Sequence, residues 1–140
     1  MREILFRAKG KGSGNWLYGY YSRLSDVTGM NDVLFAPAED PDDSNHTYCI
    51  IPETVGQYTG LKDRNGTRIF EGDILSAHFD DTFPDEETRG CVCWHDYGWH
   101  IKIGAHLDTL ESDWVSHYFE IIGNIHDNPE LLEGDHIEKL

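Results

Sequence analysis

The chain has 140 residues, a formal net charge of −15, 39% hydrophobic residues and 12% aromatic residues. This length fits one compact domain that can bury a core without metal ions or cross-links. The charge argues against non-specific binding to nucleic-acid phosphates, which depends on Lys and Arg, and against binding to anionic membrane surfaces.

The cysteine content and the hydropathy of the chain predict its compartment. The chain has three cysteines, Cys49, Cys91 and Cys93, and such a low, odd number does not indicate a disulfide framework. The first residues lead into no apolar segment of a signal peptide, and no apolar run approaches the roughly 20 residues that span a bilayer. We therefore expect a cytoplasmic protein that does not associate with membranes.

The chain begins with two predicted strands joined by a glycine-rich turn. Residues 2–9 alternate between apolar and charged side chains, as in a strand with one buried face. Residues 10–14 form the turn and residues 16–21 the second strand, which together predict an antiparallel hairpin. The second strand has three rings on one face, which we interpret as a packed face rather than a stacking platform: Trp16, Tyr18 and Tyr20.

The remaining strands are predicted from alternation and from turn residues between them. They fall at residues 47–51, 55–59, 74–79, 89–95, 99–103 and 118–125. Two short helices are expected, at residues 107–112 and 128–132, the second because Asn, Pro and an acid stand at its start. The predicted fold is therefore all-β and mainly antiparallel, with short helices.

The tight turn at residues 96–98 makes the second clear hairpin. On its first strand, Val92 and Trp94 share a face that we expect in the core, with Cys91 and Cys93 on the opposite face.

The expected architecture is a single domain, residues 1–140, built from two packed β lobes. The first lobe is residues 1–53. The second, residues 54–140, is a partly open small barrel, because a Gly-Asp turn before an apolar strand is common where small barrels change direction.

Three stretches of the chain resemble the YopX family of phage and prophage proteins. They are residues 2–8 with the downstream pair Tyr18-Gly19, the central run 54–75, and the closing run 119–132. The resemblance implies a small β-rich protein of a mobile element without an established activity, so no catalytic residue carries over. The repeated family positions are mostly turn and cap residues: Gly60, Asp63, Gly66, Gly72, Asp73, Asn124 and Pro129. The chain departs from the family at its Cys91, Cys93 and His95 face and in its long acidic insert.

Four residues of the second hairpin form a candidate zinc site: Cys91, Cys93, His95 and His100. Two thiolates and two imidazoles can hold zinc. The Cys-x-Cys spacing, however, lacks the tight turn of a Cys-x-x-Cys site, and free cysteine also serves as a small buried apolar residue. We therefore predict no structural metal and no cofactor.

Asp63, Glu71 and Asp73 are the candidate carboxylate cluster of a metal-assisted hydrolase. Asp63 and Asp73 stand beside turns, where backbone capping explains them more simply. Because no nucleophile with a base and an orienting group is identified, we predict no catalytic residues and no enzymatic activity.

The leading hypothesis is a non-enzymatic interaction protein of a phage or prophage, which self-associates in the host cytoplasm and has a host protein as a second candidate partner. One alternative is an acidic decoy that imitates DNA, although a flexible loop at residues 79–88 would not hold its charges on a rigid face. Another is a carboxylate-dependent hydrolase. Direct binding of nucleic acid is not expected, because the sequence shows no basic groove.

Overall fold

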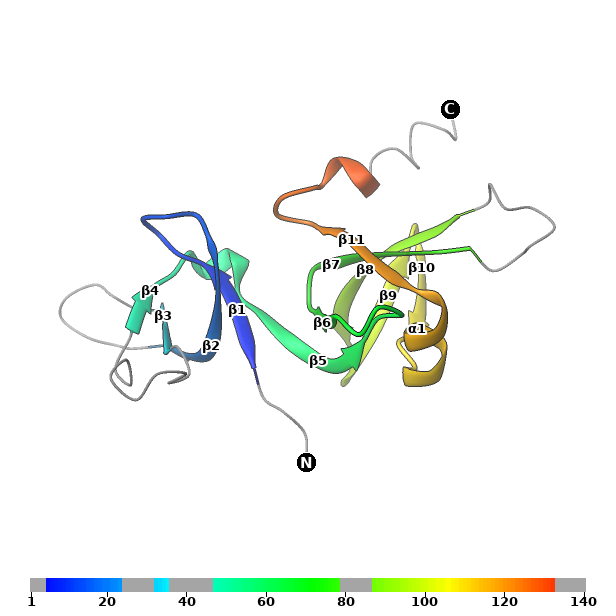
Figure 1. Cartoon of the computed structure of the whole chain (residues 1–140), viewed down its shortest axis with the longest axis horizontal. Coiled ribbons are helices and arrows are strands. Elements are labelled where there is room, and N and C mark those ends of the chain that lie inside the picture. Colours follow the sequence, from blue (N-terminus) through cyan, green and yellow to red (C-terminus); the bar gives the residue numbers. More distant parts are fainter. Residues whose placement is uncertain (1–4, 24–31, 36–46, 79–86, 133–140) are drawn as a thin grey trace. The chain divides into compact units, whose positions relative to one another are not determined.

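The computed structural model describes residues 5–23, 32–35, 47–78 and 87–132, and it comprises two compact units, Met1–Tyr58 and Thr59–Leu140 (Figure 1). The all-β class with short helices is confirmed, because both units are built on antiparallel strands. The division after residue 53 and the packing of the two lobes against each other stay predictions. No helix among the described residues is long and apolar enough to cross a membrane.

In the first unit, β1 (Phe6–Lys9) and β2 (Trp16–Arg23) form the expected hairpin. The turn between them contains Gly14 at φ 71°, a left-handed conformation that costs glycine little. Strands β3 (Asp32–Phe35) and β4 (Thr47–Cys49) continue the sheet beyond β2. The 3-10 turn η2 (Pro52–Thr54) leads into β5 (Gly56–Lys62), which pairs with β1 and crosses into the second unit.

Within the described part of the first unit, one face of the β1–β2 hairpin is packed. The packed residues are Phe6, Ala8, Leu17, Tyr21, Ile50 and Val55. Ala8 pairs with Leu17, whereas Arg7 pairs with Tyr18, so Tyr18 and Tyr20 lie on the other face. The prediction that this row of rings is the packed face is therefore wrong for Tyr18 and Tyr20, which are 47% and 54% exposed.

The second unit contains a five-stranded antiparallel sheet in the order β10-β9-β8-β7-β11, which is not closed into a barrel. Its strands are β7 (Asp73–Ala77), β8 (Thr88–His95), β9 (Gly98–Ile103), β10 (His106–Thr109) and β11 (Glu120–Asn124). The short β6 (Arg68–Phe70) lies beside β5.

The helix expected at residues 107–112 is wrong. A turn with Gly104 at φ 60° reverses the chain, so residues 106–109 pair with β9 as strand β10. The helix instead begins at the last residue of the expected range, as α1 (Ser112–Tyr118). At the second expected helix, residues 130–132 are helical.

The core of the second unit consists of Ile69, Leu75, Ala77, Val92, Trp99, Ile101, Leu110, Val115 and Phe119. Val92 is buried as predicted, but Trp94 is 52% exposed, which corrects its assignment to the core. Strand β7 pairs with β8 only from Thr88 to Cys91, so among the described strands Trp94 has β9 alone beside it in the sheet. The tip of the hairpin therefore extends past the core.

Candidate interaction surfaces

The Asp63 carboxylate stabilises a turn of the second unit. Its Oδ1 accepts hydrogen bonds from the backbone N–H of Asn65 and of Thr67, both at 2.9 Å, and its Oδ2 accepts one from Ile121 N–H at 3.0 Å. Next to it, the Arg64 N–H donates to the Phe119 carbonyl at 2.8 Å. Asp63 thus joins the turn to the start of β11, as the capping interpretation predicts.

Asp73 has a similar role in a second turn. It is buried, and its Oδ2 accepts a hydrogen bond from Phe70 N–H at 2.7 Å across the left-handed Gly72. Among the described residues, no group of three or more His, Cys, Asp or Glu side chains is arranged to hold a metal ion. Asp63, Glu71 and Asp73 therefore do not form the metal-binding carboxylate cluster considered from the sequence.

The cysteine and histidine face of β8 has the alternation that the sequence predicts. Cys93 pairs with His100 across the hairpin, and the rings of His95 and His100 lie edge to face with centroids 5.8 Å apart. Burial raises the pKa of the Cys91 thiol to about 11, with smaller contributions from Cys93 and nearby acids, and burial also raises the pKa of Cys93. Both thiols are therefore mostly protonated at neutral pH, which lowers their reactivity.

A polar cluster that the sequence did not indicate lies where the acidic stretch meets β8. Ser76 Oγ and Arg89 Nη2 both donate to the Glu87 carboxylate, the second at 2.6 Å, while Arg89 Nη1 donates to the Leu131 carbonyl at 2.8 Å. Burial alone would raise the pKa of Glu87, but the two hydrogen bonds and the charge of Arg89 outweigh it and lower the pKa. The cluster ties β8 to the C-terminal helical turn.

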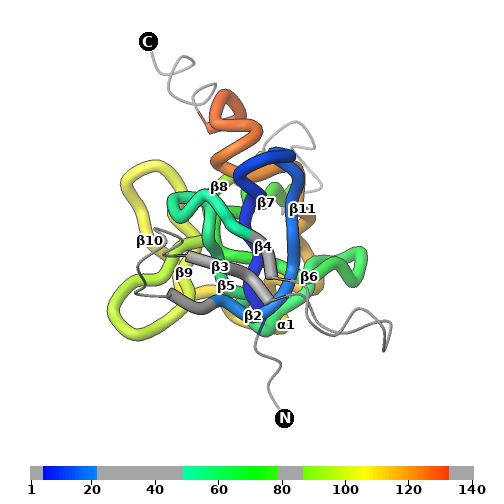
Figure 2. Tube along the Cα trace, turned by 90° about the vertical axis from the view of Figure 1, so that its left-hand side faces the viewer, coloured from blue at the N-terminus to red at the C-terminus, as the bar shows by residue number. Residues whose placement is uncertain are grey.

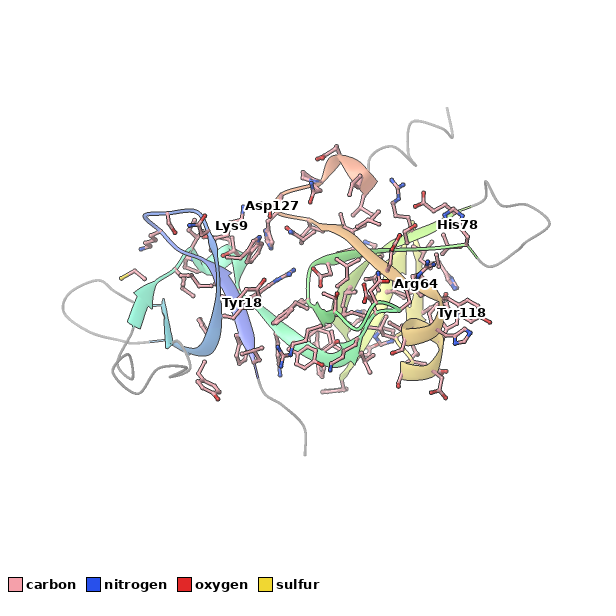
Figure 3. All side chains as sticks on the ribbon, in the orientation of Figure 1. Lys9, Tyr18, Arg64, His78, Tyr118 and Asp127 are labelled. Atoms are coloured by element: carbon pink, nitrogen blue, oxygen red, sulfur yellow. The ribbon has the colours of Figure 1, made fainter. Side chains whose placement is uncertain are left out.

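The first candidate surface is the open face of the β1–β2 hairpin, which we define as Lys9, Trp16, Tyr18 and Tyr20. Arg7 points to the same face but is buried. The Arg7 guanidinium lies 4.6 Å from the centroid of the Trp16 ring and the Lys9 ammonium 5.5 Å from it, which are cation–π distances. Figure 3 shows Lys9 and Tyr18 on the same side of the hairpin. This face combines half-exposed rings with positive charge.

The second candidate surface is the β8–β9 tip, which we define as Trp94, His95, Asp96 and Tyr97. The turn can be followed in Figure 2 as the yellow-green loop between β8 and β9. Asp96 and Tyr97 have φ values of 46° and 66°, and the Tyr97 side chain is 96% exposed. Trp94 contacts Trp99 edge to face, with centroids 4.9 Å apart.

Sequence reasoning assigned the strand rings of both surfaces to packed faces and placed Tyr97 in the tight turn of the second hairpin. Alternation shows which side chains share a face, and it does not show which face is covered. The one signal in the sequence was charge, because residues 5–23 contain Arg7, Lys9, Lys11 and Arg23 and no acidic residue, in a chain of net charge −15.

The comparisons with known proteins concern the family and the fold. The YopX protein family matches residues 5–133 of the chain. The crystal structure of protein EF1440 from Enterococcus faecalis is similar with a TM-score of 0.66 and 23% identity, over 94% of this chain and 99% of that one. No protein with a curated description matches the chain.

Proposed function

The chain belongs to the YopX family, and we propose that it is a non-enzymatic phage or prophage protein that self-associates in the host cytoplasm through its β8–β9 tip. The phage origin and the compartment rest on the family resemblance and the composition. The observation that carries self-association is Tyr97, which is strained and almost completely exposed.

Tyr97 is a less stabilising residue at this tight turn than glycine would be. A two-residue hairpin turn with both central residues at positive φ favours Asn-Gly or Asp-Gly, and a side chain in that region costs roughly 1–2 kcal/mol. Asp96 tolerates the conformation better than Tyr97 does, because Asp is enriched there. The ring of Tyr97, at 96% exposure, gains little packing within the chain to offset the strain. In our proposal, a contact with a second molecule supplies the packing energy that the Tyr97 ring lacks within its own chain.

The chemistry of the tip fits a second copy of the same surface. Tyr and Trp are among the side chains that most often dominate binding energy at interfaces, and Trp94, three residues before Tyr97 in the chain, is half-exposed. His95 Nε2 and Asp96 Oδ2 lie 3.2 Å apart, so the tip offers a partner both a basic and an acidic group. A patch with both is self-complementary, as a two-fold contact requires.

The test compares native mass and stability in one set of variants. Light scattering over a range of protein concentrations should give a mass above that of the monomer for the wild type. Tyr97→Gly should shift the mass towards the monomer while making the fold more stable, and Trp94→Ala should also weaken association. Tyr118→Ala, which removes a 42% exposed ring from α1, is the matched control and should keep the wild-type mass. A monomeric wild type, or a Tyr97→Gly protein of unchanged mass, would overturn the proposal.

The two alternatives have less support. Residues 79–86, which contain most of the acidic stretch that a DNA-mimicking decoy would need, lie outside the described residues, and Glu87 is engaged by Ser76 and Arg89. For a hydrolase, the Asp63 and Asp73 carboxylates accept backbone hydrogen bonds. Neither alternative is favoured by an observed contact.

A further inference from the structure

We infer that the open face of the β1–β2 hairpin binds single-stranded nucleic acid. The inference uses a different surface from the β8–β9 tip and does not depend on self-association. The expectation of no nucleic-acid binding remains untested, but part of its basis was the placement of Tyr18 and Tyr20 in a packed face, which is wrong.

The rings of this face are spaced for successive bases. Tyr18 and Tyr20 occupy alternate positions of β2, so their Cα atoms are separated by roughly 6.6 Å along the strand. Both rings are about half exposed, and β2 is held between β1 and β3 in the sheet. Base stacking on aromatic side chains of a sheet face is a recurring way to bind single strands, because every base has a π-face.

The positive charge of the hairpin is placed beside these rings. Lys9 stands on β1 opposite Trp16, and Lys11 follows in the exposed turn. Arg7 is buried, and its guanidinium fixes the Trp16 ring from the neighbouring strand at 4.6 Å. Residues 5–23 contain no acidic residue, so the hairpin is a basic segment of an acidic chain. Lys9 and Lys11 are therefore the side chains that we assign to phosphate contacts.

The combination of rings and cations favours a single-stranded nucleic acid over the other polyanions. An acidic peptide, including an acidic segment of a second copy, would use the lysines but leave the tyrosine rings without a role. A duplex keeps its bases stacked inside and offers few of them to a flat sheet face. A single strand uses both groups at once, with bases on Tyr18 and Tyr20 and phosphates near Lys9 and Lys11.

The experiment measures fluorescence anisotropy of labelled oligodeoxyuridine, oligouridine and a DNA duplex of the same length, at several salt concentrations, with the full chain. We expect both single strands to bind more tightly than the duplex, and oligodeoxyuridine compared with oligouridine, which differ only at the 2′-hydroxyl, distinguishes a DNA ligand from an RNA ligand. Tyr18→Ala and Tyr20→Ala should each weaken binding by about 5- to 150-fold, the range that removal of one base–ring stack produces. Tyr18→Phe should retain binding, because it keeps the π-face.

Further variants distinguish the contribution of base stacking to binding from the contributions of charge and of self-association. Binding weakens as salt rises, and the slope of log K against log salt concentration counts the neutralised phosphates. Lys9→Gln and Lys11→Gln should each make this slope less steep, by about 0.7 for each phosphate that is no longer neutralised. Tyr118→Ala should leave binding unchanged, and Tyr97→Gly should leave the affinity per monomer unchanged whatever it does to native mass. The inference fails if no single strand binds at low salt. It also fails if the duplex or an acidic peptide binds equally well, or if Tyr18→Ala and Tyr20→Ala bind like the wild type.

Discussion

The two aromatic hairpins of this protein, β1–β2 and β8–β9, both carry exposed rings but arrange them differently. In β1–β2 the rings of the open face occupy three alternate positions of the second strand, residues 16, 18 and 20, while the other face packs on Ile50 and Val55. In β8–β9 the exposure of a single face increases along the strand, from the buried Val92 to the half-exposed Trp94. An aromatic residue on a strand is therefore buried only where other elements of the sheet or core reach it.

This difference has a functional consequence. A sheet face that is open along its length presents several rings in a row, which suits an extended ligand. A hairpin tip that extends past the core presents one or two rings at a point, which suits a compact contact between proteins. The two hairpins are thus proposed to bind different partners.

The largest expected effect tests where burial ends in β8–β9. Ile101 is fully buried opposite Val92, so Ile101→Ala should lower the free energy of unfolding by about 2–5 kcal/mol. Trp94→Ala should cost clearly less, about 1 kcal/mol or below, because the ring is 52% exposed and keeps mainly its contact with Trp99. Urea titration of both variants measures the difference between the two decreases in unfolding free energy. Equal decreases would show that Trp94 is packed in the core.

The next effect compares the acids of two tight turns. Asp63→Ala leaves three backbone N–H groups without their acceptor, so we expect a decrease of about 2–3 kcal/mol in unfolding free energy. Asp96→Asn, in the exposed turn of the β8–β9 tip, should change stability by no more than about 0.5 kcal/mol. Denaturant titration measures both changes in unfolding free energy. If Asp63→Ala is as stable as Asp96→Asn, the Asp63 carboxylate does not stabilise its turn.

A smaller effect, of opposite sign, is expected at Tyr97. Tyr97→Gly removes roughly 1–2 kcal/mol of left-handed strain but gives the unfolded chain more freedom, which returns about 0.5–1 kcal/mol. The variant should therefore be more stable by about 0.5–1 kcal/mol, seen as a rise in Tm. Measuring it at a protein concentration where both forms are monomeric separates this gain from any weakening of association. A lower Tm would mean that the ring stabilises the fold itself.

The smallest effect on stability at neutral pH concerns Cys91, whose contribution changes only in alkaline solution. Its pKa is raised from 9.0 to about 11, so the folded state holds the proton more tightly than the unfolded state does. That contribution is complete below about pH 9 and is lost as the pH rises towards 11. At pH 8 Cys91 should react with a maleimide about 100-fold more slowly than free cysteine, as peptide mass spectrometry can measure. Cys91→Ser should flatten the stability profile between pH 9 and 11, and rapid labelling of Cys91 would contradict its burial.

Much of the secondary structure could be predicted from the sequence, and the errors have physical causes. The two hairpins and the capping roles of Asp63 and Asp73 follow from local alternation and turn chemistry. Strands β3 and β6 were not predicted, because each is only 4 or 3 residues long and has little alternation to show. The helix expected at residues 107–112 was placed too early because residues 106–109 pair with β9, a contact that the local sequence does not reveal.

The sequence by itself determined the family, the strand class and which side chains share a face, because these depend on neighbours along the chain. Only the tertiary structure decided which faces are covered. Burial of Ala8 and Leu17 depends on Ile50 and Val55, far along the chain, and exposure of Trp94 depends on where the pairing of β7 with β8 stops. Long-range contacts of this kind leave no periodic signal in the strand that they cover, so a packed face and a binding face look alike until the fold is known.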